Sequence, residues 1–236
     1  MLDLDPAAHS VTRLLDGVTD DQLAGPTPCA DSSVATLLDH VMGLSLAFTW
    51  AARKTTAAEG GSKGAGPGRA TAQHLDPDWR TLLPQRLSDL GHAWRSPTAW
   101  EGIAEAGGVQ MPAEIMGTVA LDELVLHGWD LARATGQPYT CDPASTAAVL
   151  AFTSASARPE QAASREGLFG PVVASPRTHL RSIGRSVSPA ATQGGRRASP
   201  AAAGTRRRHA PARPRPSVRT RCEHHPPVHR PPRHRL

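Results

Sequence analysis

The chain has 236 residues, of which 39% are hydrophobic and 20% are charged, and its formal net charge is +5. This length accommodates one ordinary domain with an appendage. The net charge conceals a division, because residues 1–174 carry −9 and residues 175–236 carry +14.

Four long segments have apolar residues at helical spacing, which predicts an all-α protein built as a four-helix bundle. An Asp-Pro pair, a cap followed by a proline, opens the first helix over residues 5–17 and the third over residues 76–94. The second helix follows two serines and extends over residues 34–58. A Gly-containing connection leads to the fourth helix, over residues 112–136, and a weaker fifth helix begins at residue 142. No segment alternates convincingly as a half-buried strand does.

The sharpest chemical signal lies on the second and fourth predicted helices. Glu123 and His127 are four residues apart, so a helix places them on one face, and His40 lies within an apolar stripe of the other helix. Burying a carboxylate and imidazoles costs free energy unless something pairs with them. A divalent metal would satisfy all three groups. Two His nitrogens and one Glu oxygen suit a catalytic zinc site with an open fourth position, although nickel or iron also accepts this set.

The same residues have a simpler interpretation. His40 would be a hydrogen-bonded core histidine, and Glu123 and His127 would form an ordinary contact between successive helical turns. The spacing is not the HExxH pattern of zinc proteases, because no His precedes the Glu. Asp130 has two interpretations as well, either as an acceptor for an imidazole N–H or as a surface partner of Arg133. The residues alone leave these alternatives open.

Two motifs resemble those of a known family. The first is Thr-Pro-Cys-Ala-Asp at residues 27–31, followed by Leu-Leu-Asp-His at 37–40, and the second is Glu-Leu-Val-Leu-His-Gly-Trp-Asp-Leu-Ala-Arg-Ala-Thr-Gly at 123–136. In this order they resemble the actinobacterial DinB-like family, and more narrowly the metal-binding domain of mycothiol-dependent maleylpyruvate isomerase and its stand-alone relatives. The resemblance runs from about residue 1 to about residue 174. It implies a DinB-like four-helix bundle with one metal held by His40, Glu123 and His127.

The resemblance also implies a function. We expect a divalent-metal-binding protein, with Zn²⁺ as the metal, that acts as a mycothiol-dependent isomerase or S-transferase. Its partners would be a low-molecular-weight thiol and a small electrophilic substrate. The alternative is a non-catalytic metal-binding bundle with a stress or interaction role, since the sequence offers no decisive general base.

Cysteine usage and apolar runs bear on the location of the protein. The three cysteines, Cys29, Cys141 and Cys222, are odd in number and lack paired spacing, so we expect reduced thiols and no disulfide framework. The N-terminus has no basic and apolar leader, and the longest apolar run, residues 41–52, is too short to span a bilayer. We therefore expect a cytoplasmic protein without a membrane partner.

Residues 175–236 consist mostly of Arg, Pro, Ala, Ser, His and Thr. Such a composition cannot bury enough apolar area to offset the entropy of ordering, so we expect a disordered basic tail after a helical domain at residues 1–174. Its arginines would bind nucleic acid only non-specifically, because the tail lacks aromatic residues for stacking on bases. A second hypothesis is a frameshift, because a GC-rich gene read out of frame yields a similar mixture.

Overall fold

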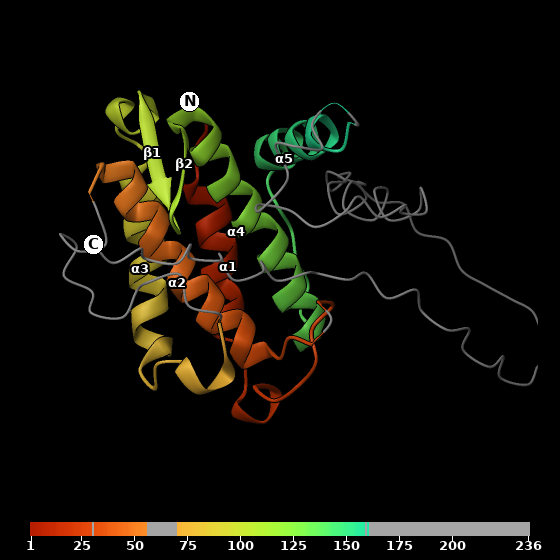
Figure 1. Cartoon of the computed structure of the whole chain (residues 1–236). Coiled ribbons are helices and arrows are strands. Elements are labelled where there is room, and N and C mark those ends of the chain that lie inside the picture. The colour runs from red at the N-terminus through yellow and green to blue at the C-terminus, as the bar shows by residue number, and fades with distance from the viewer. Residues whose placement is uncertain (30, 56–69, 159, 161–236) are drawn as a thin grey trace, which may run out of the picture.

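The computed structural model describes residues 1–29, 31–55, 70–158 and 160. Its long helices are α1 (Asp5–Leu15), α2 (Val34–Arg53), α3 (Trp79–Ala93) and α4 (Ala113–Thr135), and α5 (Pro143–Ser156) packs against α4. Short 3₁₀ helices lie in the connections, at Asp20–Gln22, Ala72–His74 and Pro97–Trp100. The helices α1 to α4 lie side by side as a bundle, with α5 at one flank (Figure 1). The predicted all-α four-helix bundle is confirmed.

Local side-chain chemistry explains where the helices begin. The Ser33 hydroxyl caps α2 by accepting a hydrogen bond from the backbone N–H of Thr36 at 3.2 Å. The Asp142 carboxylate caps α5 by accepting hydrogen bonds from the N–H groups of residues 144 and 145 at 3.1 and 2.9 Å. These two caps satisfy backbone donors that have no partner within their own helix.

Two helices end at left-handed residues. Gly136, with φ of 71°, ends α4 as predicted. Lys54 adopts φ of 57° and ends α2 at Arg53, so the predicted extension of this helix to residue 58 is wrong. The Lys54 ammonium donates to the carbonyl of Ala99 at 3.0 Å, which ties the end of α2 to the connection after α3.

A hairpin replaces the predicted loop before α4. The strands β1 (Ile103–Ala106) and β2 (Val109–Pro112) pair antiparallel, with Ala106 opposite Val109. The two residues between them, Gly107 and Gly108, have φ of 59° and 82°, which suits the two-residue turn that matches strand twist. The hairpin contacts α2 and α4 and covers one end of the bundle (Figure 1).

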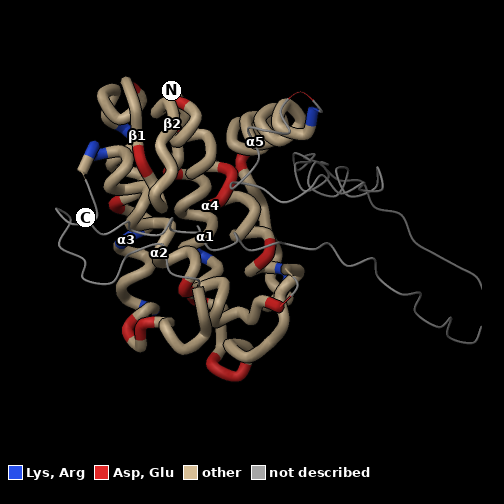
Figure 2. Tube along the Cα trace, in the orientation of Figure 1, with Lys and Arg blue, Asp and Glu red and all other residues tan. Residues whose placement is uncertain are grey.

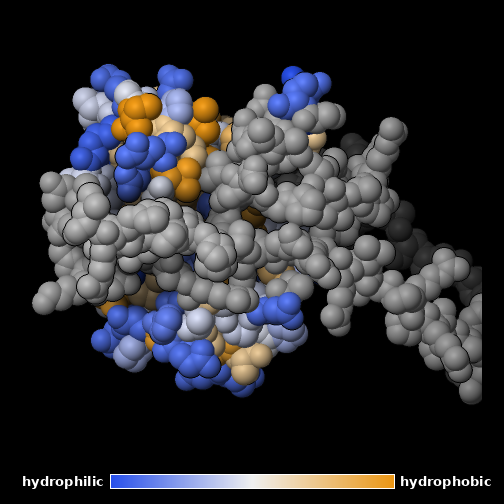
Figure 3. Space-filling model, in the orientation of Figure 1, coloured by the Kyte–Doolittle hydropathy of each residue, from blue (hydrophilic) through white to orange (hydrophobic). Residues whose placement is uncertain are grey.

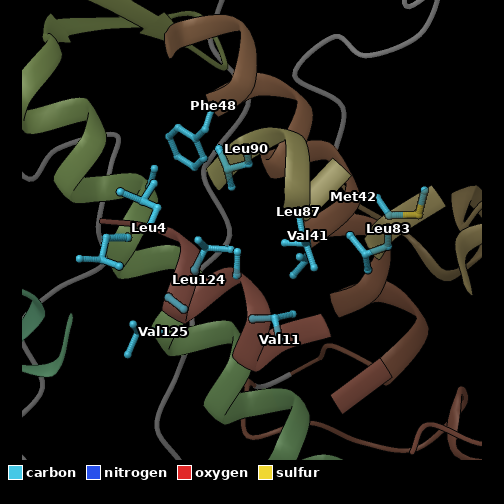
Figure 4. Packing of buried hydrophobic residues seen from close by; sticks show 14 of the residues in the cluster. Leu4, Val11, Val41, Met42, Phe48, Leu83, Leu87, Leu90, Leu124 and Val125 are labelled. Carbon is cyan, nitrogen blue, oxygen red and sulfur yellow. The ribbon is translucent and has the colours of Figure 1, made fainter. Parts of the chain in front are cut away.

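The hydrophobic core is shared by all four long helices (Figure 4). Its fully buried members include Leu4, Val34, Leu38, Leu83, Leu87, Leu90, Trp94, Met116 and Leu121. The Trp94 indole donates its N–H to the carbonyl of Phe48 at 3.1 Å, and Trp100 donates to the carbonyl of Trp94 at 2.8 Å. The two indole rings meet edge to face, 4.9 Å between centroids, and close the core beneath the hairpin.

Charge and hydropathy are distributed unevenly over the bundle. Acidic residues gather in the loops at the end opposite the hairpin (Figure 2). Hydrophobic atoms are exposed near the hairpin, where Ile103 and Ile115 are 60% and 46% exposed (Figure 3). The predicted domain boundary at residue 174 and the basic segment 175–236 lie outside the described residues.

Within the described ranges, one helix is long and apolar enough to cross a membrane, and this is α2. We expected every apolar run to be too short to span a bilayer, but that expectation considered only residues 41–52 of this helix. The whole of α2 is long enough, so the expectation does not hold for it. In the bundle 61% of the most apolar window of α2 is buried, which is also the pattern of a core helix. Length and composition alone are weak support for a membrane span.

Gly117 of α4 provides a test of the packing beneath the hairpin. A Cβ atom there would lie 2.6 Å from the Trp100 ring and 2.8 Å from the Trp94 ring, so Gly117→Ala should lower the melting temperature. The matched control is Gly43→Ala on α2, where a Cβ would meet nothing within 4 Å. The control should raise stability by about 0.5–1 kcal/mol through helix propensity alone. If thermal unfolding showed the same rise in melting temperature for Gly117→Ala and Gly43→Ala, this packing would be contradicted.

Candidate metal centre

The packing of α2 against α4 brings together the three residues singled out in the sequence. The His127 Nε2 lies 2.8 Å from Oε2 of Glu123, one turn earlier on α4. The His40 Nε2, from α2, lies 3.8 Å from the same carboxylate oxygen. The two imidazole rings meet edge to face, 4.8 Å between centroids. The predicted cluster of His40, Glu123 and His127 therefore exists as one group of side chains.

The cluster lies at the boundary between core and solvent. The side chains of His40, Glu123 and His127 are 42%, 25% and 16% exposed. The residues that follow His40 and Glu123 in the chain, Val41 and Leu124, are buried in the hydrophobic core. Small molecules can therefore reach the cluster from the His40 side, while its carboxylate is largely removed from water.

Electrostatics within the cluster favour the charged forms of Glu123 and His127. Burial opposes ionisation of Glu123, but the hydrogen bonds and charges of His127 and His40 outweigh it, so the pKa of this carboxyl is lowered. Burial also opposes protonation of His127, and here the carboxylates of Asp130 and Glu123 outweigh it and raise the imidazole pKa. Protonated histidine therefore supplies the positive charge beside the Glu123 carboxylate, and a metal bound there would have to displace that proton.

Asp130 lies behind His127, on the side away from Glu123. Its Oδ2 is 3.4 Å from Nδ1 of His127, an ion-pair contact whose geometry falls short of a hydrogen bond. In the described part of the chain Asp130 contacts His127 and forms no ion pair with Arg133, so the structure does not support its interpretation as a surface partner of Arg133. The sulfur of Cys29 lies 3.4 Å from the same Oδ2, which joins the loop before α2 to α4.

The cysteines differ from one another. Cys141 is buried and free, as expected, and burial raises the pKa of its thiol. The expectation of reduced thiols is tested within the described residues only for Cys141. Cys222 lies outside the described residues.

Sequence reasoning missed Asp122, the neighbour of Glu123. Asp122 is fully buried, and neither of its carboxylate oxygens has a hydrogen-bond partner. Burial, and after it the charge of Glu123, raises the pKa of Asp122 to about 7. The pattern of apolar residues could not reveal this burial, because an acidic residue beside another in a helix ordinarily faces water.

The donor set and its dimensions fit a divalent metal. One donor atom each from His40, Glu123 and His127 lies within 4.8 Å of the other two. In a tetrahedral zinc site with bonds of about 2.0–2.1 Å, ligand atoms stand about 3.4 Å apart. The observed separations of 2.8 and 3.8 Å from Glu123 bracket this value. Small side-chain rotations would therefore be enough to place all three atoms around one ion.

Comparison with known proteins identifies relatives of this bundle. The sequence model of the mycothiol maleylpyruvate isomerase N-terminal domain matches residues 4–132, more than half of the chain. Two uncharacterised proteins, from two strains of Mycobacterium tuberculosis, are each 28% identical to this chain over 148 residues. The matched part covers 58% of this chain and 68% of each relative. No solved structure matches the chain significantly.

The unpartnered carboxyl of Asp122 leads to a prediction about stability. A pKa of about 7 lies above the ordinary value of 3.8, so the folded state holds this proton more tightly than the unfolded state does. The contribution of Asp122 to stability is therefore present below about pH 4 and is lost as the pH rises towards 7. Asp122→Asn should raise stability at pH 8 by about 1–3 kcal/mol, or roughly 3–10 °C in melting temperature, with a smaller gain at pH 4.5.

Thermal unfolding at the two pH values would measure this effect. Asp89→Asn, at an exposed position of α3, is the control and should change the melting temperature little at either pH. A lower melting temperature for Asp122→Asn at pH 8 would mean that the Asp122 carboxylate stabilises the fold.

Proposed function

Because the chain belongs to the family of the mycothiol maleylpyruvate isomerase N-terminal domain, we propose that it binds a divalent metal and uses a low-molecular-weight thiol. In this proposal it transfers the thiol to a small electrophile or isomerises that electrophile. Mycothiol is the proposed thiol, in keeping with the family. The observation that carries the proposal is the convergence of two imidazoles and one carboxylate, from two helices, on a single point beside solvent.

The proposed ligands are His40, Glu123 and His127, and the proposed metal is Zn²⁺. Two nitrogens and one oxygen form a set that zinc accepts with a fourth position open to a small molecule. When bound, the metal would lower the pKa of a thiol that reaches this position. Nickel and iron accept similar sets, so the choice of zinc rests on the thiol chemistry, since zinc binds sulfur well.

Each residue of the cluster has a task in this proposal. Glu123 supplies negative charge between the two imidazoles, as the 2.8 and 3.8 Å distances support. Asp130 keeps the Nδ1 edge of His127 turned away from the cluster, so that Nε2 faces Glu123. The partial exposure of His40 leaves a path for the thiol and its second substrate.

The chemistry also suggests a compartment. A reaction that consumes a free thiol requires surroundings that keep thiols reduced, so we propose that the protein works in the cytoplasm. The apolar helix α2 would then serve the core of the bundle and not a membrane. The basic segment 175–236 has no role in the proposed reaction.

Metal analysis tests the proposed ligands. Protein purified in the presence of zinc should contain about one tightly held metal ion per chain. His127→Ala should reduce this content to less than roughly a tenth, since loss of a direct ligand should cost at least as much affinity as loss of a residue that supports one. His92→Ala, at an exposed position of α3, should keep the wild-type content. If His127→Ala kept the wild-type zinc content, α4 would not provide the metal ligands as proposed.

Thiol binding tests the proposed chemistry. A thiol that loses its proton on binding to the metal-loaded protein should release that proton to the buffer. Calorimetric titration with mycothiol in two buffers should therefore give two different binding enthalpies. Their difference should be proportional to the difference between the ionisation enthalpies of the buffers. Failure of the metallated protein to bind any thiol would favour the alternative of a non-catalytic metal-binding bundle.

A further inference from the structure

An open groove lies at the end of the bundle opposite the hairpin, between the loop that follows α1 and the loop that precedes α3. Its volume is about 560 Å³, which is enough for several side chains of a docked segment. Apolar residues of both loops line most of it, among them Leu23 and Leu75. Its charged lining residues are Asp20, Asp76 and Arg80. The groove therefore combines apolar walls with two carboxylates.

The two loops that border the groove are acidic (Figure 2). Residues 16–33 and 70–78 contain six aspartates and no Lys or Arg. Asp76 is half-buried, and the exposed aspartates are Asp16, Asp20, Asp21, Asp31 and Asp78. Among the described residues, one of the six forms an ion pair, namely Asp20 with Arg80 at 2.7 Å. Most of the negative charge around the groove therefore has no basic partner within the described part of the chain.

The chain carries a segment of opposite charge beyond the described residues. Residues 206–221 contain seven Arg and no acidic residue, and Pro and Ala stand between the arginines. Guanidinium groups pair with carboxylates in a fixed fork geometry, and small apolar residues between them suit apolar walls. The composition of this segment precludes an apolar core of its own, but charge can hold such a segment on an acidic surface.

The length of the chain permits this contact. Residue 206 follows the last described residue, 160, by 46 positions, which span about 150 Å when fully extended. The longest described helix, α4, has 23 residues and is about 35 Å long. The segment can therefore reach the groove from any face of the bundle, and covalent attachment gives it a high effective concentration there.

We propose that residues 206–221 dock on this groove, with their arginines paired to the aspartates of residues 16–33 and 70–78. The inference is independent of the proposed function, because the residues that line the groove are not those of the proposed metal cluster. Nucleic acid is the competing partner for the same arginines. The groove is favoured because it belongs to the same chain and because the segment has no aromatic residue to stack on bases.

Trypsin cleaves after arginine, so its cleavage rate within residues 206–221 reports whether the segment is covered. The test variant of the full chain combines Asp20→Asn, Asp21→Asn and Asp76→Asn. At about 20 mM salt, where screening is weak, the segment should be cleaved at least about three-fold faster in this variant than in the wild type. The variant removes charge from the groove and its border, so docking should be lost.

The matched control combines Glu101→Gln, Glu105→Gln and Glu114→Gln, at exposed positions near the hairpin. It changes the net charge by the same amount as the aspartate variant, and it should be cleaved at the wild-type rate. Equal cleavage rates in the wild type and in both variants would overturn the proposal.

Salt provides a second arm. At about 0.5 M salt the screening length falls to about 4 Å, so the difference between the wild type and the aspartate variant should vanish. A difference that persists at this salt concentration would overturn the charge pairing. If the first variant does not fold, Asp16→Asn, Asp21→Asn and Asp78→Asn replace it, because these exposed side chains form no hydrogen bond or ion pair among the described residues.

A 20-nucleotide oligothymidylate tests the competing partner. Loss of docking frees the arginines, so fluorescence anisotropy should show at least about three-fold tighter binding by the aspartate variant than by the glutamate control at about 20 mM salt. Equal affinities would mean that the groove does not hold the arginines. That result would overturn the proposal and assign the segment to nucleic acid.

Discussion

The contact between Glu123 and His127 is the interaction on which the site depends. Its 2.8 Å separation follows from helical spacing, which stacks residues four apart on one face of α4. The packing of α2 then adds His40 to the same carboxylate at 3.8 Å. A partly buried carboxylate between two imidazoles is costly without positive charge, and either protonated histidines or a metal can supply it. The rest of the bundle holds α2 and α4 in the register that this arrangement needs.

The cluster of His40, Glu123 and His127 has one side towards solvent and one side towards the hydrophobic core. Towards solvent, His40 is partly exposed and gives access. Towards the interior, Val41 and Leu124, the residues next to His40 and Glu123 in the chain, are buried in the core. Asp122 adds a second carboxyl on the buried side of α4, without a hydrogen-bond partner. A cation bound by Glu123 would offset the repulsion between these neighbouring carboxyls and would thereby stabilise α4.

The sequence was sufficient for the helices and for the cluster. Apolar spacing and Asp-Pro signatures predicted the four long helices, because each buries a continuous apolar face. The cluster of His40, Glu123 and His127 could be predicted because polar residues on apolar helix faces are unusual. The hairpin before α4 could not, since its strands have four residues each and too few alternating positions to form a pattern. The left-handed end of α2 at Lys54 and the burial of Asp122 depend on tertiary packing, which spacing along the chain does not encode.

X-ray absorption at the metal edge of the purified protein is the most direct test of the central claim. We expect a zinc ion whose nearest shell contains two imidazole nitrogens and one carboxylate oxygen at about 2.0–2.1 Å, with sulfur at about 2.3 Å only after a thiol is added. The spectrum of His40→Ala should lose one imidazole contribution. A shell dominated by cysteine sulfur in the absence of added thiol, or one without imidazole, would contradict the account.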